Sequence, residues 1–164
     1  MRKLSLALTP ILLAMVVGGC QPPPEAEMEP ARTAQEAQAN FDALRAEWQS
    51  LANADDWAAV AEFYTEDAVF TDVSGIVYNG REAIAGYFEG SLPGASDLVI
   101  QTADFVVHGD MAAAYGTFSQ NVEGPEGPMP MSGMWQTVSL YQADGSLKIH
   151  LHQNMIPADM GPSM

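Results

Sequence analysis

The chain has 164 residues, of which 48% are hydrophobic, and a formal charge of −15 at pH 7. Its 21 acidic and 6 basic residues leave too few cations for the basic patches that bind phosphates, so nucleic acid is excluded as an expected partner. Residues 33–157 form a stretch long enough for one domain with one hydrophobic core.

The N-terminus has the pattern of an export signal. Arg2 and Lys3 supply a positive start, and an apolar stretch follows over residues 4–17. This stretch is shorter than the roughly 20 residues that cross a bilayer as a helix. A short apolar segment after a charged start is typical of a secretory signal peptide.

The end of this segment, "VGGC", resembles the bacterial lipobox, in which small residues precede a cysteine. The resemblance implies a signal peptide over residues 1–19, cleavage before Cys20, and lipid on Cys20. Gln21 follows instead of Asp, which by the sorting rule of enteric lipoproteins favours the outer membrane, facing the periplasm. The alternative is an ordinary secretory signal with an incidental cysteine. Cys20 is the single cysteine, so no internal disulfide is expected.

Two terminal segments lack an apolar period. Residues 20–32 contain "QPPPEAEMEPAR" and are rich in Pro and Glu, which predicts an extended tether. Residues 158–164 are predicted to be a flexible tail. Removing Arg2 and Lys3 with the signal would leave 4 basic against 21 acidic residues, a formal charge of −17. Dispersed acids of this kind favour solubility.

Three helices are predicted. Thr33 and Glu36 form a capping box, and an apolar stripe at helical spacing follows, made of Ala37, Phe41, Leu44, Trp48 and Leu51. Asp55 or Asp56 caps a second helix that carries Trp57, Val60, Ala61 and Tyr64 on one side, and "TED" at residues 65–67 then turns the chain. A third helix begins at Asn79-Gly80 and ends at Gly90.

The strands are predicted from alternation. "AVFTDVSG", residues 68–75, reads as a strand with Asp72 on the same face as Phe70, and "IVY" returns after a turn at Ser74-Gly75. Four more strands cover residues 98–107, 111–122, 131–142 and 146–154, with hairpin glycines at Gly109 and Gly145. The order predicts an α+β fold, in which a curved antiparallel sheet packs against three helices.

Two stretches, residues 52–88 and 134–157, resemble the nuclear transport factor 2-like superfamily and, within it, the SnoaL-like proteins. They contain "DAVF", "GREAI" and a closing "KIHLHQ", which is similar to the last strand of the association domain of calcium/calmodulin-dependent kinase. The resemblance covers residues 35–157 and implies a cone-shaped sheet around an apolar pocket, often dimeric through the sheet's outer face. It is specific for fold only, because this fold hosts several reactions and plain assembly domains.

Asp72 matches the segment where ketosteroid isomerases of this superfamily carry their proton-shuttling aspartate. The match implies that Asp72 points into the pocket, where loss of hydration would favour its neutral form and suit it to proton transfer beside a carbonyl. The alternative is that Asp72 binds backbone amides around the Ser74-Gly75 turn. Trp48 and Thr137 stand where those enzymes place a tyrosine and a second acid, so a strong oxyanion site and steroid isomerisation itself are not expected.

His150 and His152 are two residues apart on a predicted strand and should share a face. If that face lines the pocket, the pair is suited to acid–base chemistry, with His152 as the candidate catalytic group, or to a metal held together with Asp72. If it lines the outer face, the pair is solvated or contacts a partner. The predicted ligand-binding side chains are Trp48, Tyr64, Phe70, Tyr115, Trp135, Thr137 and His150.

The sequence thus predicts a lipid-anchored envelope protein that binds a small apolar or carbonyl-bearing molecule, with Asp72 and His152 as candidate acid–base groups. No cofactor or resident metal is expected. A homodimer is expected. Two alternatives stay open. One is a non-catalytic dimeric scaffold. The other is a metal-binding protein that uses His150, His152 and the late methionines Met129, Met131, Met134, Met155, Met160 and Met164.

Overall fold

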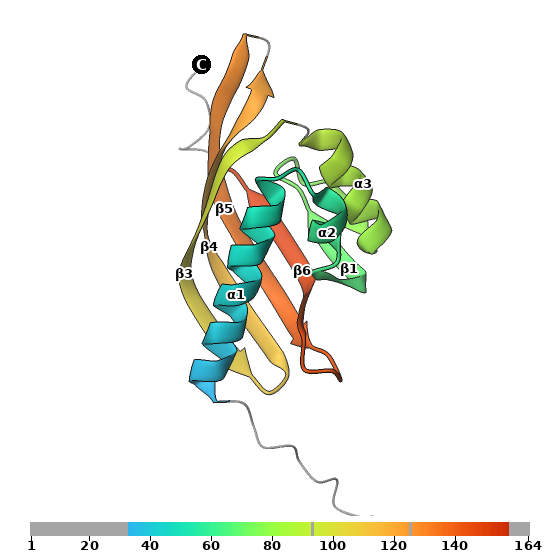
Figure 1. Ribbon diagram of the computed structural model, residues 1–164, viewed down its shortest axis with the longest axis vertical. Helices are drawn as coiled ribbons and strands as arrows, with labels where there is room; N and C mark the ends of the chain where they lie inside the picture. The colour runs from blue at the N-terminus through green and yellow to red at the C-terminus, as the bar shows by residue number, and fades with distance from the viewer. Residues whose placement is uncertain (1–32, 93, 125, 158–164) are drawn as a thin grey trace, which may run out of the picture. The chain divides into compact units, whose positions relative to one another are not determined.

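The computed structural model describes residues 33–92, 94–124 and 126–157. The predicted signal peptide, Cys20, the tether and the tail lie outside these residues. In the described part of the chain, no helix combines the length and the hydropathy that a membrane crossing would need. The predicted α+β fold is confirmed, because three helices pack against a curved six-stranded sheet within these residues (Figure 1).

Each helix begins where the sequence supplies a cap. Helix α1, Ala34–Ala52, starts at the capping box of Thr33 and Glu36. Helix α2, Trp57–Ala61, starts at Asp56, whose carboxylate accepts a hydrogen bond from the Ala59 N–H at 3.1 Å. Helix α3, Arg81–Ser91, follows Gly80, whose φ of +85° is readily adopted only by glycine.

The sheet contains β1 (Tyr64–Thr71), β2 (Val77–Asn79), β3 (Ser96–His108), β4 (Met111–Gly124), β5 (Gly127–Tyr141) and β6 (Leu147–Met155). Their order across the sheet is β2-β1-β6-β5-β4-β3. All neighbours are antiparallel except β1 and β6, which run parallel. The predicted curved antiparallel sheet is therefore confirmed except at this pair, which is parallel. The three hairpins from β3 to β6 bring β6 beside β1 in the same direction, which local alternation does not reveal.

Two predicted boundaries were also wrong. Strand β1 starts at Tyr64, so the "TED" segment lies inside the strand and not in a turn, and the register of β1 against β6 shifts between Tyr64 and Val69. The predicted loop before residue 131 is largely strand, since β4 and β5 continue to Gly124 and Gly127. Pro128 and Pro130 are tolerated there because that end of β5 pairs only with β4.

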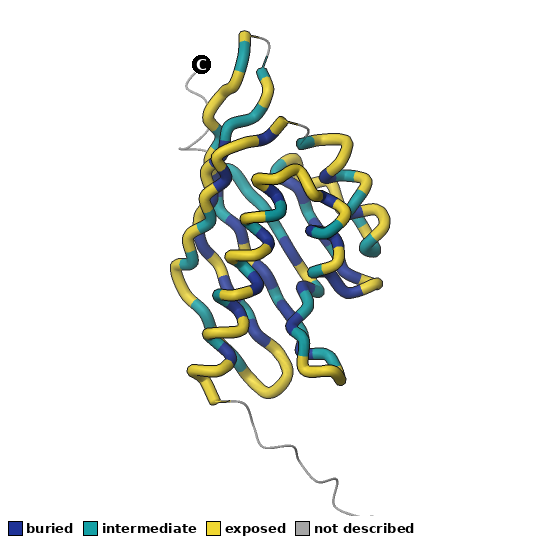
Figure 2. Tube along the Cα trace, viewed as in Figure 1, coloured by how far each residue is buried: buried dark blue, intermediate teal, exposed yellow. Residues whose placement is uncertain are grey.

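The helices cover one face of the sheet (Figure 1). Helix α1 contacts β3 and β6, α3 contacts β1 and β2, and α2 contacts both other helices. The buried residues of Figure 2 gather between these two layers. This interface holds the core, which includes the fully buried Tyr64, Phe70, Ile84 and Phe88. A functional cavity in this fold would therefore lie between helices and sheet.

Candidate functional site

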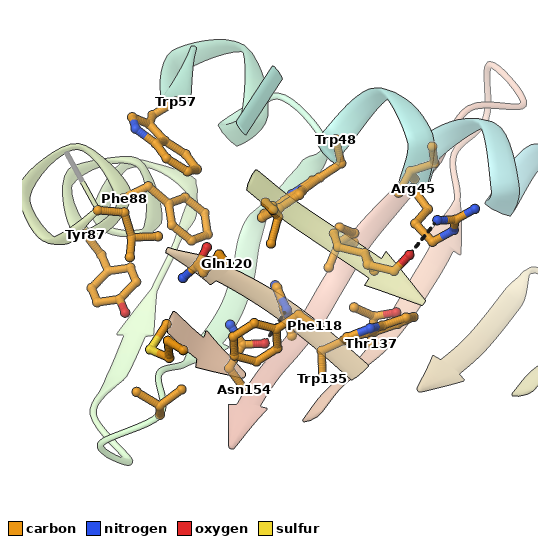
Figure 3. Close-up of a pocket in the computed structure, with 18 of the residues that line it drawn as sticks. Arg45, Trp48, Trp57, Tyr87, Phe88, Phe118, Gln120, Trp135, Thr137 and Asn154 are labelled. Carbon is orange, nitrogen blue, oxygen red and sulfur yellow. Dashed lines mark hydrogen bonds between the residues drawn. The ribbon is translucent and has the colours of Figure 1, made fainter. Parts of the chain in front are cut away.

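An apolar cavity lies between α1, α2, α3 and the inner face of the sheet (Figure 3). The space open to the centre of a water molecule is about 80 Å³, several times the roughly 10–15 Å³ that one water needs. Its wall is largely aromatic and is formed by Phe41, Trp48, Trp57, Tyr87, Phe88, Phe118 and Trp135, with aliphatic side chains between them. The polar side chains in the wall are Arg45, Gln120, Thr137, His152 and Asn154.

All three tryptophans of the chain line this cavity, but their N–H groups differ. The Trp135 Nε1 donates to the Thr117 carbonyl at 3.1 Å. The Nε1 atoms of Trp48 and Trp57 are buried and have no hydrogen-bond partner among the described residues, and the same holds for the Thr137 hydroxyl. Unsatisfied buried polar groups cost roughly 1–3 kcal/mol each. An acceptor atom brought within hydrogen-bond distance of these groups would offset that cost.

A buried hydrogen-bonded chain reaches the cavity wall at His152. The Tyr64 hydroxyl lies 2.7 Å from His152 Nδ1, and His152 Nε2 lies 3.0 Å from Asn154 Oδ1. Because an amide oxygen only accepts, this arrangement places the proton of the imidazole on Nε2, and Nδ1 accepts from Tyr64. Both ring nitrogens are thus satisfied when the ring is neutral.

Burial controls the protonation of this chain. His152 is 7% exposed, and loss of hydration lowers its pKa to about 4, against a weaker opposing effect of the Asn154 hydrogen bond. Burial also raises the pKa of Tyr64. The nearby Trp48 indole lowers the pKa of Tyr64 and so offsets part of the rise caused by burial. No hydrogen bond of ordinary geometry joins the two side chains. At pH 7 the ring is neutral, and its one acceptor nitrogen, Nδ1, already accepts from Tyr64, so His152 would take a proton from a bound molecule only after that hydrogen bond breaks.

Tyr64 and Phe70 were predicted to line the pocket. They do not line the cavity but lie behind it. Both are fully buried. The Phe70 ring meets the His152 ring edge-on at 5.0 Å, and the Tyr64 ring stacks on it at 6.0 Å. These rings exclude water from the far side of His152. They therefore support the cavity wall without forming it.

Asp72 does not line the cavity, so the prediction that it points into the pocket is corrected. Strand β1 ends at Thr71, and Asp72 starts the turn that follows. Its Oδ1 accepts hydrogen bonds from the backbone N–H groups of Ser74, at 2.8 Å, and Ile76, at 2.9 Å. The geometry supports the alternative, in which Asp72 binds backbone amides around the Ser74-Gly75 turn.

His150 and His152 do not share a face. Strand β6 pairs Ile149 with Ser139 and Leu151 with Val138, so His150 is an extra residue without a partner on β5. Such a bulge reverses the alternation. His150 Nδ1 instead lies 3.0 Å from the Thr65 hydroxyl and 3.5 Å from the Asp67 carboxylate. Across the described ranges, no three His, Cys, Asp or Glu side chains converge to hold a metal.

Tyr115 lies on the outer face of the sheet and is 48% exposed, so its predicted place in the pocket wall was wrong. Nearby, Val106, Ala113, Val138 and Leu151 form a row across β3, β4, β5 and β6. Val106 and Leu151 are also exposed. The resemblance implies a dimer interface on this face, and the homodimer stays a prediction.

Of the predicted site residues, Trp48, Trp135, Thr137 and His152 line this one cavity, and it is also lined by Arg45, Trp57, Gln120 and Asn154, which were not predicted. The position of Arg45 could have been noticed in the sequence. It lies four residues after Phe41 and three before Trp48, which puts a cation at the edge of the apolar stripe of α1.

Comparison with known proteins identifies the family. The family model of the SnoaL-like domain matches residues 45–146, more than half of the chain. The chain belongs to the SnoaL-like domain family. No curated protein matches this SnoaL-like chain.

Solved structures share its fold. A nuclear transport factor 2-like protein with a cystatin-like fold from Novosphingobium aromaticivorans is 21% identical, with a TM-score of 0.65 over 76% of this chain and 84% of that one. A ketosteroid isomerase-like protein from Erwinia carotovora atroseptica is 16% identical, with a TM-score of 0.67 over 75% and 98%. A protein from Xanthomonas campestris described as a calcium/calmodulin-dependent protein kinase II association domain is 24% identical, with a TM-score of 0.63 over 78% and 90%. At these identities the likeness shows the fold alone.

Proposed function

We propose that this SnoaL-like domain binds a small, largely apolar molecule that carries a carbonyl or similar acceptor, and that His152 is the group available for acid–base chemistry on it. The observation that carries the proposal is the combination of an aromatic cavity with buried, unpartnered donors on Trp48 and Trp57. A few placed polar groups in an apolar cleft are typical of small-molecule sites.

The N–H groups of Trp48 and Trp57 have almost no exposed surface. A ligand therefore reaches them only after small side-chain rotations, which commonly accompany binding. The ring of a ligand would replace water against Phe88 and Trp135, and its acceptor would satisfy an N–H group that is otherwise orphaned. Apolar burial supplies affinity in this arrangement, and the acceptor supplies orientation.

The test compares 2-tetralone with tetralin, which differ by one carbonyl group. In calorimetry on the full-length protein, 2-tetralone should bind about tenfold more tightly, the effect of one hydrogen bond of about 1.4 kcal/mol. Trp48→Phe keeps an aromatic ring and should remove much of this difference, whereas Trp135→Phe, whose N–H already has a partner, should not. Binding of neither compound would contradict the proposal and favour the scaffold alternative.

The role of His152 is measured on the same complex. Proton exchange at C1 of bound 2-tetralone in D₂O that disappears in His152→Gln would extend the function from binding to acid–base chemistry. Exchange that is equal in both proteins would leave His152 as a binding residue.

We also propose that the domain is held in the cell envelope by lipid on Cys20. The support is Arg2, Lys3, the apolar segment and "VGGC". Expressed in a bacterium, the protein should fractionate with membranes, and Cys20→Ser should be released or stay unprocessed. Equal membrane association of both forms would contradict the anchor without affecting the cavity.

A further inference from the structure

Arg45 gives the cavity a positive charge in an acidic protein. Among the described residues that line the cavity, Arg45 is the one with a formal charge, because none is Asp or Glu and His152 is neutral at pH 7. Elsewhere in the described chain, Arg81 pairs with Glu62 and donates to the Tyr64 carbonyl, and Lys148 donates to the Glu62 carbonyl. Neither of these cations lines the cavity.

The guanidinium of Arg45 is held in place on one side only. Its Nη1 donates to the Ile100 carbonyl at 2.9 Å, which ties α1 to β3 (Figure 3). Its Nε is buried and has no hydrogen-bond partner within the described ranges. The edge formed by Nε and Nη2 is therefore without a partner in the described residues, and a ligand would reach Nε after a small rotation of the side chain. Two parallel N–H groups on such an edge match the two oxygens of a carboxylate.

The surroundings of Arg45 leave this edge without an internal anion. Asp42 and Asp104 line a groove on the other side of Arg45, between α1 and β3. Neither forms an ion pair with Arg45 in the described residues, and the two carboxylates accept from Gln38 and from the Phe105 N–H instead. A half-buried cation without a paired acid favours a bound anion.

The position of Arg45 also constrains the shape of the anion. Figure 3 shows Arg45 at one end of the drawn side chains and Trp57, with Phe88, at the other. The wall between them is apolar apart from Gln120, Thr137, His152 and Asn154. An anion at Arg45 would thus have its remaining atoms along an aromatic surface.

We propose that the cavity selects molecules with a carboxylate at one end of an apolar body, and that Arg45 binds the carboxylate through Nε and Nη2. This inference rests on the proposed small-molecule function and specifies its ligand class. The acidic surface of the protein would repel such anions at long range, so the preference arises from contact at Arg45 and from burial of the apolar body.

The test uses 4-phenylbutanoate and 4-phenylbutanamide, which share shape and differ in charge. In calorimetry on the full-length protein at pH 7, the carboxylate should bind at least about tenfold more tightly, since a charge-assisted bidentate contact is roughly twice as strong as a neutral one. Arg45→Met, which keeps an apolar stem, should bring the two affinities within about twofold. Arg45→Lys should recover part of the difference, because it restores charge but not the fork.

Lys148→Gln is the matched control. It removes the same charge outside the cavity and should leave the tenfold preference intact. Equal binding of acid and amide by the unaltered protein, or an equal loss of preference in Lys148→Gln and Arg45→Met, would overturn the inference while leaving the small-molecule function in place. Binding of neither compound would overturn both. If Arg45→Met fails to fold, the preference of the unaltered protein and its partial loss in Arg45→Lys, compared with Lys148→Gln, still test the inference.

Discussion

Acidification from pH 7 to pH 4 should lower the free energy of unfolding by about 3 kcal/mol through His152 alone. Burial holds the pKa of the folded imidazole at about 4, against an ordinary value of 6.5. As the pH falls through 6.5, the unfolded chain takes up a proton that the folded domain does not accept. The contribution is therefore fully present above pH 6.5 and is lost progressively down to pH 4.

Urea unfolding of the full-length protein at pH 7, 6, 5 and 4 measures this loss, with His152→Gln as the comparison. The difference in unfolding free energy between the two proteins should shrink by about 3 kcal/mol over that range. Comparison with the variant is needed because the pKa values of Asp67 and Asp144 are also lowered in the fold, which makes stability fall on acidification for separate reasons. Parallel curves for the two proteins would show that His152 is not a buried neutral group.

Replacing Asp72 with alanine should lower the free energy of unfolding by about 2 kcal/mol at pH 7. Its Oδ1 is the acceptor for two backbone N–H groups, those of Ser74 and Ile76. Both donors lose their partner in Asp72→Ala. In Asp72→Asn the amide oxygen accepts the same two bonds without the negative charge, so the loss should be smaller. Thermal or urea unfolding checks both values.

Glu89→Ala is the control for Asp72, since it removes an exposed acid from α3 and should change stability by less than about 0.5 kcal/mol. The affinity of Asp72→Ala for 2-tetralone should equal that of the unaltered protein. A large loss of affinity without loss of stability would restore Asp72 as a functional residue and contradict its placement in the turn.

The sequence was sufficient for the elements that local patterns encode. The capping box at Thr33, the apolar stripe of α1 and the glycines of two hairpins, with φ of +58° at Gly109 and +83° at Gly145, all stand where spacing placed them. Trp48 and Thr137 were assigned to a common pocket through the family resemblance. The cavity confirms that they lie together.

The remaining features depend on non-local pairing. The bulge at His150 arises where β6 pairs with β5, and it separates two histidines that a regular strand would place on one face. Because β1 ends at Thr71, Asp72 begins a turn, and its carboxylate accepts from the N–H groups of Ser74 and Ile76 and is not part of the cavity wall. Arg45 was missed because a single cation at the edge of an apolar stripe usually extends to solvent, and only the fold shows that its Nε is buried.

The indole N–H signals of the three tryptophans give the most direct measurement of ligand binding in the cavity. In ¹⁵N–¹H correlation spectra of the full-length protein titrated with 2-tetralone, the Trp48 or Trp57 signal should move downfield as its N–H gains an acceptor. The Trp135 N–H already donates to Thr117, so its signal should move much less and serves as an internal reference. Tetralin should produce smaller downfield shifts. Saturating 2-tetralone that leaves all three signals unchanged would contradict the account.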